Sequence, residues 1–190
     1  MGFFDDAPAP VPEPLWRHHH PWDPPEAEFP SIVSIDTTII GRSDRAAVAI
    51  TGLAAVSNGF EIQLTAHFRP GADDETGSGR GRGPGPKEAR VSLRFGLQLA
   101  DGTKVFSRHG RRPRDHDAEP EGPLLQEFAG AATPLTLLTR WWAWPLPPKG
   151  PLDFVTELPA HELAESRVTL DAGAILDAAQ RSIQLWPEAA

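Results

Sequence analysis

Three consecutive histidines, His18 to His20, are the residues whose type points most directly to chemistry. Neutral imidazoles bind zinc, nickel and copper. Adjacent residues of an extended chain point in different directions, so three histidines in a row cannot all ligate one ion without distorting the backbone. We therefore interpret them as a surface patch and predict no metal site and no cofactor.

Other catalytic patterns are incomplete. Residues 161–165 begin like the zinc-protease helix motif, but Glu165 stands where that motif needs its second histidine. The chain has no cysteine, which excludes a thiolate nucleophile or ligand. No Gly-x-Ser-x-Gly elbow is present. We predict no catalytic residue and a protein that is not an enzyme; the open alternative is an enzyme with a metal-assisted site drawn from His67, His109, His116 or His161.

The charge balance excludes further functions. Eighteen Lys and Arg against 26 Asp and Glu give a net charge of −8. Binding nucleic acid or an anionic membrane requires a basic surface, so we expect neither partner. Residues 1–6 carry no basic or apolar signal region, which favours the cytoplasm. Arginine outnumbers lysine, and alanine, glycine and proline are abundant, as is typical of a high-GC bacterial genome.

Tryptophans are concentrated in one segment, which contains Trp141, Trp142 and Trp144. In a strand, Trp142 and Trp144 share one face and Trp141 lies on the other, so one face must point away from the core. That face either packs under another part of the chain or offers an aromatic platform to a sugar, a proline-rich peptide or a protein.

Residues 1–30 contain eight prolines, which block helix and interior strand and predict an extended, Pro-rich N-terminal arm. Trp16, Trp22 and Phe29 are unusual in a solvated tail. They either pack back onto the domain or anchor a partner.

The next hundred residues alternate between apolar and polar with the period of strands. The alternation is clearest at 60–68 and 91–99, and weaker at 48–56. Asn58-Gly59 and Asp101-Gly102 predict hairpin turns. Further strands are predicted at 32–40, 103–108, 135–146, 152–158 and 168–170, with loops at 71–86 and 109–123. Residues 124–134 are a short helix or a loop. An apolar stripe at Ile175, Ala179, Ile183 and Trp186 predicts a helix over 171–186.

These elements predict an all-β fold: an antiparallel β-sandwich of about seven strands in an Ig-like layout, with one C-terminal helix. A small β-barrel is the alternative. Residues 31–190 form the single domain and 1–30 form the arm.

The function predicted is that of a non-catalytic, soluble module that acts through contacts with a protein partner or through self-association. The predicted partner-binding residues are Trp16, Trp22, Phe29, Trp141 and Trp144. A carbohydrate or small-molecule binding module that uses a tryptophan platform is the alternative.

Overall fold

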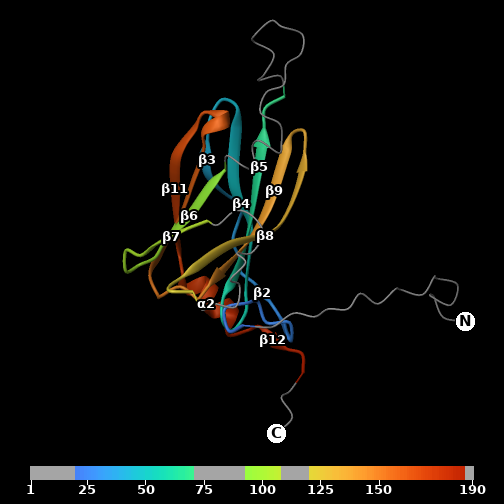
Figure 1. The fold of residues 1–190 in the computed structure, drawn as a ribbon, viewed down its shortest axis with the longest axis vertical. Helices are drawn as coiled ribbons and strands as arrows, with labels where there is room; N and C mark the ends of the chain where they lie inside the picture. Colours follow the sequence, from blue (N-terminus) through green and yellow to red (C-terminus); the bar gives the residue numbers. More distant parts are fainter. Residues whose placement is uncertain (1–19, 71–92, 108–119, 187–190) are drawn as a thin grey trace, which may run out of the picture.

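The computed structural model describes residues 20–70, 93–107 and 120–186. These residues form twelve strands in three antiparallel sheets with one α-helix (Figure 1). The all-β prediction is therefore confirmed. The Ig-like layout of about seven strands is not, because short strands at both ends of the described chain add pairings that alternation alone does not reveal. The predicted loop at 71–86 and most of the predicted arm lie outside the described residues.

The largest sheet contains six strands. Along it run β2 (Ser31–Ile32), β4 (Ala46–Ala55), β5 (Phe60–Phe68), β9 (Thr136–Trp144) and β8 (Leu124–Thr133), while β3 (Thr38–Arg42) also pairs with β4. The second sheet has the order β11 (Leu163–Asp171), β10 (Pro151–Leu158), β6 (Arg94–Gln98) and β7 (Lys104–Phe106). The third is a ribbon of β1 (Glu28–Phe29) and β12 (Ile183–Gln184).

Strand β4 shows why its alternation is weak in the sequence. Val48 and Ile50 are buried, and the next buried positions are Leu53 and Ala55. The alternation of buried and less buried positions is displaced by one residue, because the register with β5 shifts between Ile50 and Gly52, as it does at a β-bulge. Strand β5 has no such interruption, and its predicted alternation is confirmed over Phe60–Phe68.

Three predicted elements are wrong. The single strand predicted at 32–40 is broken, because β2 and β3 pair separately with β4 and residues 33–37 belong to no strand. Residues 124–134 are neither helix nor loop, because β8 pairs with β9 along most of its length. The helix is shorter than predicted: α2 covers only Gly173–Ala179. The N–H groups of Arg181 and Ser182 donate to the carbonyls three residues back, which tightens the last turn and ends the helix. The chain then becomes β12.

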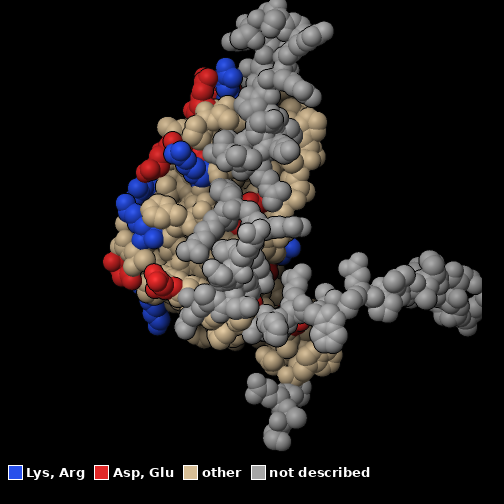
Figure 2. Space-filling model, in the orientation of Figure 1, with Lys and Arg blue, Asp and Glu red and all other residues tan. Residues whose placement is uncertain are grey.

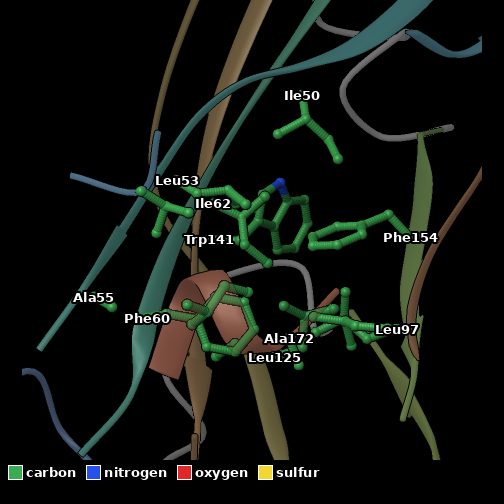
Figure 3. Close-up of a cluster of buried hydrophobic side chains, with 14 of the residues drawn as sticks. Ile50, Leu53, Ala55, Phe60, Ile62, Leu97, Leu125, Trp141, Phe154 and Ala172 are labelled. Carbon is green, nitrogen blue, oxygen red and sulfur yellow. The ribbon is translucent and has the colours of Figure 1, made fainter. Parts of the chain in front are cut away.

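The two larger sheets face each other across the main core. Trp141 from β9 lies near its centre, with Phe95 of the opposite sheet 5.5 Å away between ring centroids. Figure 3 shows side chains from both sheets and from the helix segment meeting around Trp141. Ile175 of α2 closes one end of this core. Side chains of both larger sheets and of the helix therefore contribute to one core.

Candidate functional site

Trp141 and Trp142 are both buried, on opposite faces of β9. Trp141 is fully buried in the core, and its indole N–H donates to Thr139 Oγ1 at 2.9 Å. Trp142 points away from the core, and its indole N–H donates to the carbonyl of Trp22 at 2.8 Å. The outer face of β9, which carries Trp142, is thus covered by another part of the same chain. Neither ring is available as a platform.

The cover is formed by residues 20–29, here called the strap. Trp22 is buried and stacks on His20, with ring centroids 4.6 Å apart. The amide of Asn58 donates to the carbonyls of Pro21 and Asp23 at 2.8 and 3.0 Å. Trp22 therefore packs back onto the domain, which is one of the two roles predicted for it.

The turn between β4 and β5 is the anchor of the strap. The buried carboxylate of Glu28 accepts hydrogen bonds from the Ser57 backbone N–H at 2.8 Å and from its hydroxyl at 2.6 Å. Gly59 must be glycine, because a Cβ there would lie 2.6 Å from the Trp142 ring. Asn58-Gly59 is thus a hairpin turn, as predicted, and it also binds the strap.

The opposite side of β1 faces solvent. Phe29 pairs directly with Ile183 of β12, so their side chains share one side of the ribbon, and they are 59% and 62% exposed. Strands β2 and β12 lie at the same end of the molecule (Figure 1). Ile32 of β2 is 72% exposed, and Trp186, two residues after β12, is 70% exposed. We call Phe29, Ile32, Ile183 and Trp186 the terminal patch.

The other predicted contact residues fall outside this patch. Trp144 is only partly exposed and precedes Pro145 through a cis peptide bond. Trp16 lies outside the described residues. Of the four predicted residues that the structure describes, only Phe29 is largely exposed.

A second surface is the outer face of the four-stranded sheet. In register across its strands, one row contains Lys104, Gln98, Asp153 and Thr169, and the next contains Phe106, Gly96, Val155 and Arg167. Because Gly96 has no side chain, the second row is interrupted between Phe106 and Val155. A partly open hollow of about 370 Å³ lies there, which we call the Gly96 hollow.

Charged pairs surround the Gly96 hollow. Arg94 and Glu157 meet at 2.9 Å, and Arg167 lies 3.3 Å from Asp153 and 3.5 Å from Glu165. Figure 2 shows side chains of both signs close together along the side of the molecule that carries β11, β6 and β7. In the adjoining β6–β7 turn, a hydrogen bond from the Thr103 N–H lowers the pKa of the Asp101 carboxyl below its ordinary value.

The histidines do not gather into a metal centre within the described residues. His67 lies on the outer face of β5 near Thr136, whereas His161 is buried and stacks on Phe68 at 4.5 Å. The described part of the chain contains no group of three or more His, Cys, Asp or Glu that could hold a metal ion. His109 and His116 lie outside it.

No protein-family model, curated protein or solved structure matches this chain. In the segments that the structure describes, no helix is long and apolar enough to cross a bilayer.

The sequence reasoning missed several exposed apolar residues. In the sequence, Ile183 and Trp186 resemble the end of an apolar helical stripe, whereas Ile183 pairs with Phe29 in a strand and both side chains are largely exposed. The exposure of Phe106 could have been predicted from the sequence. In a short strand after Asp101-Gly102, Lys104 and Phe106 flank Val105, so alternation places Val105 inside and both neighbours outside.

Proposed function

We propose that the protein is a non-catalytic module that acts through protein–protein contacts, with the terminal patch as its contact surface. The observation that carries this proposal is the side-by-side exposure of Phe29 and Ile183 on the ribbon. Grouped apolar side chains on a surface are typical of interfaces, and large aromatic anchors supply much of their binding energy. Ile32, three residues after Phe29, and Trp186, three residues after Ile183, are also largely exposed.

The ribbon is held in place before any partner arrives. The Glu28 side chain points inward and is hydrogen-bonded to Ser57. Phe29 is the next residue of the same two-residue strand, so its side chain points outward. Leu185 N–H also donates to the Ala27 carbonyl at 2.8 Å, which joins the two segments beyond their strand pairing. A preordered surface loses little conformational entropy on binding, which favours association.

The partner in this proposal is a second copy of the chain. A two-fold axis places the same patch on both sides of an interface, so one self-complementary apolar surface is sufficient. The proposed location is the cytoplasm, which fractionation of cells that express the tagged chain would check.

Sedimentation velocity over a concentration series tests the proposal. We expect a monomer–dimer equilibrium for the wild type, and association weakened by about tenfold or more in Phe29→Ser. Phe106→Ser is the matched control, because Phe106 is also highly exposed but lies on another surface. A wild type that stays monomeric at its highest soluble concentration would overturn self-association, as would equal weakening by both substitutions.

A further inference from the structure

The Gly96 hollow has the form of a small binding site. A Cβ at position 96 would lie 3.0 Å from the Val105 carbonyl oxygen and 3.9 Å from the Phe106 ring. Glycine therefore leaves the floor free, with the Phe106 ring on one side and Val155 on the other. The volume of about 370 Å³ lies in the range of small-ligand pockets.

The aromatic side chain beside the hollow is largely open to solvent. Phe106 is 73% exposed, more than any other large apolar side chain in the described residues. The face of an aromatic ring carries partial negative charge, so it attracts weakly positive C–H groups that stack on it. The C–H faces of pyranose rings are groups of this kind.

The charges around the hollow favour a neutral ligand. Three cations, Arg94, Lys104 and Arg167, and two carboxylates, Glu157 and Glu165, line the hollow. A third carboxylate, Asp153, pairs with Arg167 beside it, so the formal charges of these six groups cancel. Both arginines are already paired. An anion would have to displace a carboxylate from its arginine, and a cation would have to displace an arginine from its carboxylate. A hydroxyl group can instead bond to the guanidinium N–H groups and carboxylate oxygens that the ion pairs do not use.

The polar groups lie on both sides of the Phe106 row. Gln98 and Lys104 occupy the preceding row, and the Arg94–Glu157 pair stands on the opposite side of Gly96. From β7 to β11 the face spans three inter-strand spacings, or about 14 Å. That length fits two or three linked sugar rings. We propose that the Gly96 hollow binds a short neutral oligosaccharide, with one ring stacked on Phe106 and its hydroxyls bonded to Gln98, Arg94 and Glu157.

This site is independent of the terminal patch, and its test uses the full-length chain. The amide resonances of ¹⁵N-labelled protein are followed by NMR during titration with maltotriose, cellotriose or tri-N-acetylchitotriose, each to millimolar concentration. We expect at least one trisaccharide to shift resonances of 94–98 and 104–106 in a saturable way. Absence of shifts with all three, or saturable shifts confined to other residues, would overturn the proposal.

Two substitutions and a control sharpen the test. Phe106→Ala removes the stacking ring and is expected to weaken the best trisaccharide by about tenfold. Gln98→Ala removes one hydrogen-bonding group and is expected to weaken it less. Phe128→Ala is the control, because Phe128 is exposed on β8, in the other sheet. Unchanged affinity in Phe106→Ala would overturn the assignment, as would inorganic phosphate shifting the same resonances at lower concentration than every trisaccharide.

Discussion

The outer faces of the two larger sheets differ in whether another part of the chain covers them. On the six-stranded sheet, the strap covers Trp142 and turns an apolar surface into an interior. On the four-stranded sheet, Phe106 stays exposed among charged pairs, and Gly96 leaves a hollow beside it. A large aromatic residue on an outward position can therefore hold the fold together or remain available to a ligand.

Whether an outward aromatic residue stabilises the fold or stays exposed depends on whether another segment of the chain packs over it. Trp142 is covered because Asn58 and Glu28 fix the strap over it. Phe106 lies on the short edge strand β7 beside Gly96, which has no side chain to cover the ring. The comparison implies that substitutions on the covered face change stability, while substitutions on the open face change binding.

The largest expected effect is that of Trp142→Ala. It deletes a buried ring and the hydrogen bond to the Trp22 carbonyl, so we expect a loss of about 3–5 kcal/mol in the free energy of unfolding. Urea denaturation followed by circular dichroism measures this loss. Phe106→Ala, the matched change on the open face, is expected to stay within about 0.5 kcal/mol of the wild type. Similar losses in both variants would break the comparison.

A smaller effect is expected when an anchor of the strap is removed without touching the aromatic rings. Glu28→Ala leaves the Ser57 N–H and hydroxyl without their carboxylate, which costs about 1–3 kcal/mol. The same denaturation measurement applies. Glu165→Ala, which removes an exposed carboxylate of the open face, is the control and is expected to cost about 0.5 kcal/mol or less. If Glu28→Ala is equally neutral, the strap does not depend on this anchor.

The smallest effect concerns the β6–β7 turn beside the open face. The Thr103 N–H lowers the pKa of Asp101 in the folded state, so this group stabilises the fold above its unfolded pKa. That contribution is lost as the pH falls through the lowered folded pKa. We expect the NMR titration of the Asp101 carboxyl to show a midpoint below that of an unperturbed aspartate. Asp101→Asn should slightly reduce the acid dependence of stability, and a midpoint at or above the ordinary value would contradict the expectation.

The sequence predicts those parts of the fold in which local alternation and core burial coincide. Strand β5 is of this kind, and so is the turn at Asn58-Gly59. Strand β8 escapes prediction because residues 128–133 are mostly small and mostly exposed, so they carry no apolar period. Its structure is imposed by pairing with β9, which a single-sequence pattern does not contain.

The candidate surfaces depend still more on contacts between distant segments. Phe29 becomes part of a patch only because β1 pairs with β12, more than 150 residues away in the sequence. The Gly96 hollow requires four strands in register, and no local pattern reveals that register. The concentration of tryptophans alone predicts Trp141 as a partner-binding residue, but Trp141 is fully buried in the core.

The most direct test of this account is hydrogen–deuterium exchange of the intact chain at low and high protein concentration. The account predicts that peptides covering residues 24–29 and 183–184 are protected already in dilute solution, because the strap belongs to the fold. Their protection should increase further with concentration, while that of 94–98 and 104–106 stays constant. Rapid exchange of the strap at every concentration would contradict the account, and so would a concentration-dependent increase confined to the open face.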